Sequence, residues 1–138
     1  MALTFKYKTV QRPDGSEVKA PVIPITLQSE KTIWTTALLD SGADISVISE
    51  ELAKTIGMDL SAQPHEVFGI GGPIQAIESK VTILFEKKHE KYKFQIPILI
   101  VVGKHDFPVL LGRQGFFEKF RIEFDEIKEK ITLRKISS

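Results

Sequence analysis

The sequence predicts an all-β fold with one or two short helices. Apolar and polar residues alternate through much of the chain, as in Leu3, Phe5 and Tyr7, and this is the period of a half-buried strand. Turn residues such as Pro13-Asp14-Gly15 separate the alternating stretches. With 138 residues, 42% of them hydrophobic, the chain is long enough to bury one core and is expected to form a single domain over residues 1–138.

The first half of the chain predicts two hairpins and one helix. Residues 3–23 are expected to form a hairpin that turns at Pro13-Asp14-Gly15, and residues 25–28 pair with 33–39. The helix is expected over 50–56 because Ser49 can cap its first turn, two glutamates follow at its positive end, and Gly57 can end it.

The second half predicts two more hairpins. Strands are expected at 81–85 and 94–100, joined by a charged, solvated tip at 86–93. A short helix is expected over 114–120. The last hairpin pairs residues 121–125 with 130–134.

Composition excludes several classes of protein. With no cysteine, the chain has no disulfides, no thiolate metal sites and no cysteine nucleophile. A net charge of +1 gives no field that would attract nucleic acid or an anionic membrane, so neither is an expected partner. The longest apolar stretch, residues 94–102, is far shorter than the ~20 residues that span a bilayer. A cytoplasmic location is the simplest expectation.

Metal and nucleophile sites find no support. The three histidines, His65, His89 and His105, lie 24 and 16 residues apart in polar contexts, which fits surface positions better than a metal site. Neither Ser41 nor Ser46 lies in the Gly-x-Ser-x-Gly context of a nucleophile elbow. No metal and no cofactor are expected.

One segment interrupts the strand pattern. The apolar residues Ala37-Leu38-Leu39 lead directly into Asp40-Ser41-Gly42-Ala43-Asp44. An acid at the end of a buried strand is costly unless it is hydrogen-bonded or functional. Taken alone, Asp-Ser-Gly could be an ordinary turn.

Two further segments change that interpretation. Gly69-Ile70-Gly71-Gly72 follows about 30 residues after Asp40, and Val109-Leu110-Leu111-Gly112-Arg113 follows later. In this order the three segments resemble the active-site loop, the glycine-rich flap tip and the apolar-apolar-Gly-Arg segment of retropepsins, the retroviral-type aspartic proteases. The resemblance covers roughly residues 22–134, after an N-terminal hairpin extension at 1–21.

The resemblance implies a retropepsin-like acid-protease barrel with one lobe per chain, and it implies roles for single residues. Asp40 is the expected catalytic residue, supported by Ser41, Gly42, Ala43, Asp44 and Arg113. Gly42 and Asp44 would bind the substrate backbone, and Arg113 is expected to pair with Asp44. The expected flap and pocket residues are Gly69, Ile70, Gly71, Gly72, Leu38, Val47 and Leu110, with core packing as the competing interpretation for the apolar members.

The same resemblance implies a homodimer. Hydrolysis of a polypeptide substrate by this chemistry needs two carboxyl groups, and the chain contains one Asp-Ser-Gly segment, so each subunit would supply one Asp40. Residues 130–134 are the expected strand of a dimer sheet built from chain termini. The alternatives are a protease-fold binding or dimerisation module with no significant peptidase activity, and a generic β-barrel ligand binder.

Overall fold

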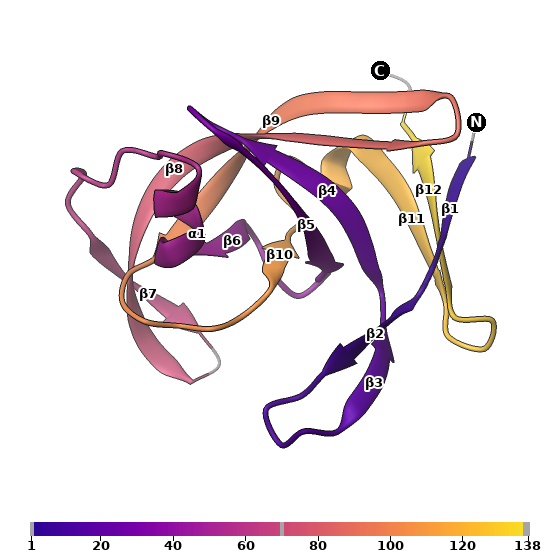
Figure 1. Cartoon of the computed structure of the whole chain (residues 1–138), viewed down its shortest axis with the longest axis horizontal. Helices are drawn as coiled ribbons and strands as arrows, with labels where there is room; N and C mark the ends of the chain where they lie inside the picture. The colour runs from indigo at the N-terminus through magenta and orange to yellow at the C-terminus, as the bar shows by residue number, and fades with distance from the viewer. Residues whose placement is uncertain (1, 70, 137–138) are drawn as a thin grey trace.

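Strands dominate the computed structural model, which describes residues 2–69 and 71–136 (Figure 1), and the all-β prediction is confirmed. The strands are β1 Ala2–Lys6, β2 Lys8–Gln11, β3 Glu17–Ala20, β4 Val22–Gln28, β5 Thr32–Leu39, β6 Ser46–Ser49, β7 His65–Gly69, β8 Gly72–Lys87, β9 Glu90–Val101, β10 Val109–Leu111, β11 Phe120–Asp125 and β12 Lys130–Lys135. The helices are α1, Glu50–Thr55, and a 3-10 turn, η1, Phe117–Lys119.

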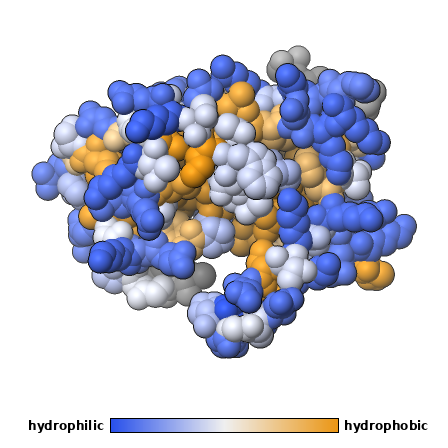
Figure 2. Space-filling view, viewed as in Figure 1, coloured by the Kyte–Doolittle hydropathy of each residue, from blue (hydrophilic) through white to orange (hydrophobic). Residues whose placement is uncertain are grey.

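The largest sheet holds seven strands in the order β4-β5-β10-β6-β9-β8-β7. A further pairing between β4 and β8 closes the first six of these strands into a ring. The strands β5 and β10 run parallel, as do β6 and β9. The register Leu39↔Leu111 brings the ends of β5 and β10 together, although five other elements lie between them in the sequence. In the view of Figure 2, apolar surface lies over the middle of the molecule and is bordered by polar side chains.

The core fills this ring of strands and continues to the buried side chains of the sheet of β1, β12 and β11. Alternate positions of single strands have at most 1% of their surface exposed, among them Ile23, Ile25 and Leu27 on β4 and Ile96, Ile98 and Ile100 on β9. Burying an aliphatic side chain of this size contributes about 1.5–3 kcal/mol. The strand periodicity in the sequence therefore identified the faces that hold the domain together.

The pairing of the N-terminal strand differs from the first predicted hairpin. β1 does not fold back on the strand that follows it but pairs antiparallel with β12, so that Leu3 lies opposite Leu133 and Phe5 opposite Ile131. All four of these side chains are buried. The hairpin within residues 3–23 is limited to β2 and β3, whose partners run from Lys8↔Ala20 to Gln11↔Glu17.

The C-terminal hairpin is confirmed, but its expected role in a dimer sheet is not supported. β12 lies between β1 and β11 in a three-stranded sheet, so both of its edges are already paired within the chain. A partner strand could pair with β12 only by displacing one of them. The expectation for residues 130–134 rested on an N-terminal strand paired within its own hairpin, whereas β1 pairs with β12 across nearly the whole chain.

Other predicted bounds shift by a few residues. The hairpin of β8 and β9 continues to Lys87↔Glu90, which leaves a tip of only two residues, Lys88 and His89. α1 begins where Ser49 caps it, with the hydroxyl accepting from the Leu52 N–H. The helix expected over 114–120 is reduced to η1. No helix among the described residues is long and apolar enough to cross a membrane.

Candidate active site

The Asp40–Asp44 loop begins where β5 leaves the sheet. Ala37 and Leu39 are buried on β5 and fix the end of the strand. The backbone N–H of Asp40 then donates to the carbonyl of Leu111 on β10 (3.0 Å), and its carbonyl accepts from the N–H of Ala43 (3.2 Å). Asp40 is thus held at both backbone groups, at the edge where two parallel strands end together.

The Asp40 carboxylate faces the turn that follows it. Its Oδ1 accepts a hydrogen bond from the backbone N–H of Gly42 at 2.9 Å. A Cβ on Gly42 would lie 3.2 Å from the same Oδ1, so a side chain there would crowd the carboxylate. Gly42 does not have a positive φ, so the need for glycine in Asp-Ser-Gly comes from this close approach and not from a left-handed backbone conformation.

The segment that follows β10 fixes the loop from the other side. Three successive N–H groups of this segment donate to the loop or to the start of β6: Gly112 to the Ser46 hydroxyl, Arg113 to the Ala43 carbonyl and Gln114 to the Asp44 carbonyl, each at 2.9 Å. Ser46 is completely buried and is the one buried polar side chain among the described residues. Sequence reasoning considered Ser46 only as a nucleophile and missed this structural role.

Arg113 and Asp44 form the ion pair that the sequence predicted. One guanidinium nitrogen of Arg113 binds the Asp44 carboxylate, and both side chains are exposed, at 57% and 73%. Together with the backbone bonds from residues 112–114, the ion pair closes the loop against the segment that follows β10. Arg113 therefore acts on the loop, as expected.

Three of the expected pocket residues, Leu38, Val47 and Leu110, lie side by side. Leu110 on β10 is in register with Leu38 on β5 and with Val47 on β6, so the three side chains share one face of the sheet next to the Asp40 loop. Each is half-buried, whereas the flanking Ala37, Leu39, Val109 and Leu111 face the core and are buried. Core packing alone does not account for this half-exposed apolar row.

The glycine-rich segment joins β7 to β8. These strands pair as far as Gly69↔Gly72, Gly71 lies in a turn, and Gly72 has a φ of +110°. Ile70 lies outside the described residues. Phe68, which sequence reasoning did not single out, is in register with Pro73 and is 82% exposed, a costly position for an aromatic ring in water.

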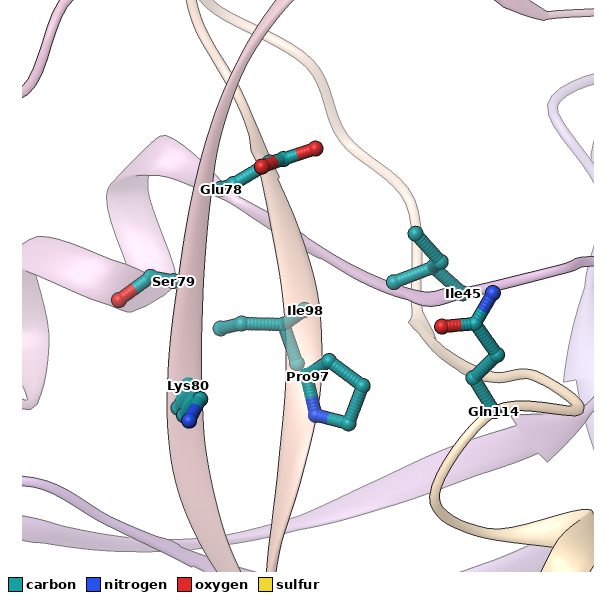
Figure 3. Close-up of a pocket in the computed structure, with 7 residues that line it drawn as sticks. All are labelled: Ile45, Glu78, Ser79, Lys80, Pro97, Ile98 and Gln114. Atoms are coloured by element: carbon teal, nitrogen blue, oxygen red, sulfur yellow. The ribbon is translucent and has the colours of Figure 1, made fainter.

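An open pocket of about 610 Å³ lies one residue beyond the loop (Figure 3). Its lining residues are Ile45, Glu78, Ser79, Lys80, Pro97, Ile98 and Gln114. Ile45 and Gln114, each next to a member of the Arg113–Asp44 pair, stand on one side, and the β8 residues stand on the other. Asp40 does not line this pocket, and no sequence feature indicated it.

Comparison with known proteins identifies this arrangement. The family model for aspartyl proteases matches residues 23–114, two-thirds of the chain, including the Asp40 loop and the segment from Val109 to Arg113. The chain belongs to the aspartyl protease family. The resemblance to retropepsins is thereby confirmed.

Viral polyproteins and a bacterial structure agree with this assignment. The chain is 35% identical over 71 residues to the Gag-Pol polyprotein of Rous sarcoma virus, and 43% identical over 51 residues to the Gag polyprotein of avian leukosis virus. These matches cover 51% and 37% of this aspartyl protease chain but only 4% and 7% of the polyproteins. A retropepsin-like aspartic protease from Rickettsia conorii shares the fold, with a TM-score of 0.60, 18% identity, and coverage of 96% of this chain and 92% of that one.

A metal site is a separate question. No group of three His, Asp or Glu side chains among the described residues could hold a metal ion.

The charged side chains in and next to the loop are Asp40, Asp44 and Arg113, and the last two form the ion pair. Asp40 is therefore the one carboxylate in the loop with no cationic partner in the described chain.

Proposed function

We propose that this protein is a homodimeric aspartic endopeptidase in which the Asp40 carboxylates of two subunits activate a water molecule. The observation that carries the proposal is Asp40 itself. It is a carboxylate with no ion-pair partner among the described residues, and it stands in an Asp-Ser-Gly loop that is held by hydrogen bonds from β10 and residues 112–114. Membership of the aspartyl protease family supports a peptidase.

The chemistry needs two carboxyl groups in different protonation states. The ionised carboxylate takes a proton from water as the water oxygen attacks the carbonyl carbon, and the protonated carboxyl gives its proton to the carbonyl oxygen. A proton then passes to the amide nitrogen and the C–N bond breaks, which leaves a carboxylic acid and an amine. Two carboxyls about 3 Å apart cannot both ionise, so the pair holds one proton between them.

A single chain supplies only half of this pair. The sequence has one Asp-Ser-Gly segment, so the second Asp40 would come from a second copy across a two-fold axis. Ser41 is exposed beside Asp40 and would hydrogen-bond to the partner subunit's loop. Because β12 is paired on both edges, an extension of the three-stranded sheet into the partner subunit would use the outer edge of β1 or β11.

The substrate would bind as an extended strand between the loop and the β7–β8 hairpin. On the loop side, the Gly42 carbonyl and the Asp44 backbone would bind the peptide main chain, and the row of Leu38, Val47 and Leu110 would receive apolar side chains. The glycines of the hairpin would let it act as a flap over the peptide. The exposed ring of Phe68 supports this role, because a bound peptide would cover it.

Replacement of the carboxylate tests the proposal. Asp40→Asn keeps the size and the acceptor oxygen for the Gly42 N–H but cannot act as the base. The variant should lose all measurable cleavage of a peptide library while its circular dichroism spectrum and sedimentation stay unchanged. Inhibition of the wild-type protein by peptides with a hydroxyl at the scissile carbonyl should accompany this result. Cleavage by a homogeneous Asp40→Asn sample would remove Asp40 from catalysis.

A further inference from the structure

The hairpin of β2 and β3, here called the arm, is a feature of this chain outside the part that matches the family. The match begins at residue 23, and the arm ends at Ala20. Its strands pair with each other and with no other described strand. The turn is well defined: Gly15 has a φ of +88°, the Arg12 N–H donates to the Ser16 carbonyl, and the Asp14 carboxylate accepts from the Ser16 N–H at 2.9 Å.

The base of the arm is hydrogen-bonded to the residue that precedes Asp40. Pro21, which follows β3, accepts a hydrogen bond at 3.0 Å from the N–H of Leu39, the residue before Asp40. From this point the arm leaves the sheet and projects to the lower side of the view, past the segment that joins β5 to β6 (Figure 1).

The side chains of the arm are only partly covered by the rest of the chain. Val10 and Val18 are direct cross-strand partners on one face, and both keep part of their surface exposed. Thr9 and Lys19 form the matching pair on the other face and are exposed. In Figure 2 the arm stands away from the body, and apolar surface lies where the two meet. A two-stranded hairpin alone is at best marginally stable in water, so this one needs a further contact.

We infer that the arm packs against the partner subunit beside the partner's catalytic loop, with the face of Val10 and Val18 turned inward. This inference rests on the proposed homodimer. If two Asp40 carboxylates share a proton, the subunits must approach each other at the Asp40 loop. An element that starts next to Leu39 and projects past that loop then enters the space of the second copy. By two-fold symmetry each subunit gives one arm and receives one.

Two variants and a control test the arm. In the first, Asn-Gly replaces residues 9–19, so that a two-residue turn joins Lys8 to its strand partner Ala20. The other two sheets are left intact. The second is the pair Val10→Ser and Val18→Ser. The matched control, Thr9→Ser with Lys19→Ser, changes the opposite face of the same strands. Sedimentation equilibrium measures the dimer dissociation constant of each, and circular dichroism verifies the fold.

The inference predicts that both arm variants raise the dissociation constant at least about tenfold, while the control changes it less than about twofold. A wild-type dimer whose dissociation constant is unchanged in the arm variants would overturn the inference and leave the proposed function standing. Weaker cleavage of long peptides with unchanged dimerisation would also overturn it, since the arm would then contact substrate. A wild-type protein that is active only as a monomer would contradict both the arm contact and the shared carboxylate pair.

Discussion

Gly112 lies so close to Ala43 that it leaves no room for a side chain. A Cβ on Gly112 would come within 2.8 Å of the Ala43 carbonyl oxygen, and Ile45 lies at the same distance. Both contacts are to backbone atoms, which cannot rotate away. The Leu-Leu-Gly-Arg segment thus has a physical explanation: glycine lets the end of β10 reach the Asp40–Asp44 loop, and the next residue pairs with Asp44.

Gly112→Ala should therefore disrupt the loop. We expect a destabilisation of at least about 2 kcal/mol, because backbone must move to accept the methyl group and the hydrogen bond from Gly112 to the buried Ser46 hydroxyl is strained. Chemical denaturation measures the effect. Gly71→Ala is the matched control, since a Cβ there meets nothing within 4 Å. Equal stability of the two variants would show that the close approach is unimportant.

Loss of the Arg113 side chain should affect activity more than stability. Both members of its ion pair with Asp44 are more than half exposed, and such pairs contribute about 0–1 kcal/mol to folding. Arg113→Ala should unfold at nearly the wild-type denaturant concentration but hydrolyse peptides more slowly, because the Asp44 side of the loop loses its restraint. A loss of several kcal/mol, or unchanged kcat/KM, would contradict this role.

The sequence was informative where contacts are local. Alternation identified the strands of the β4–β5, β8–β9 and β11–β12 hairpins, because each such pair folds back over a short turn. It could not identify the pairing of β1 with β12, which brings together residues about 130 positions apart and is set only by the buried partners on both strands.

The candidate site also contains residues that the sequence indicated and residues that it did not. Asp40, Ser41 and Gly42 stand out because an acid ends an apolar strand. The pair of Asp44 and Arg113 joins residues 69 positions apart and was expected from the resemblance to retropepsins, not from the local pattern. Ser46 was missed as a support because its role depends on a backbone N–H 66 residues away. Phe68 was missed because an aromatic residue in a strand pattern is ordinarily a core residue, and only the structure shows that its ring is exposed.

Tyr7 should make the stability of the protein sensitive to alkaline pH. Burial, and then the hydrogen bond from its hydroxyl to Glu126 at 2.7 Å, raise the pKa of Tyr7 to about 12 from an ordinary value of 10.0. The folded state therefore retains a proton that the unfolded state loses. The resulting stability is complete below pH 10 and is lost as the pH rises toward 12.

Tyr7→Phe separates this effect from the titration of other groups. At neutral pH the variant should be less stable by about 1 kcal/mol, the net value of a hydrogen bond. Between pH 10 and 12 its stability should fall less steeply than that of the wild-type protein. Denaturation with urea at several pH values gives both numbers. Parallel pH dependence of the two proteins would show that Tyr7 does not titrate in this range.

The activity should have a bell-shaped dependence on pH. The proposed Asp40 pair would be active with one proton: at low pH both carboxyls would be protonated and no base would remain, and at high pH both would be ionised and no acid would remain. The logarithm of kcat/KM should therefore fall on both sides of an acidic to mildly acidic optimum. Chelators should leave this profile unchanged. Activity that rises steadily to pH 9 would require a different catalytic group.

The most direct test of the shared Asp40 pair is specific activity measured with sedimentation across a wide dilution series of the wild-type protein. If the catalytic site forms between two copies, specific activity should fall in proportion to the fraction of dimer. Mixing in an excess of Asp40→Asn chains should lower it further, because mixed dimers hold a single carboxylate at the site. A species that sediments as a monomer and retains full specific activity would contradict the account.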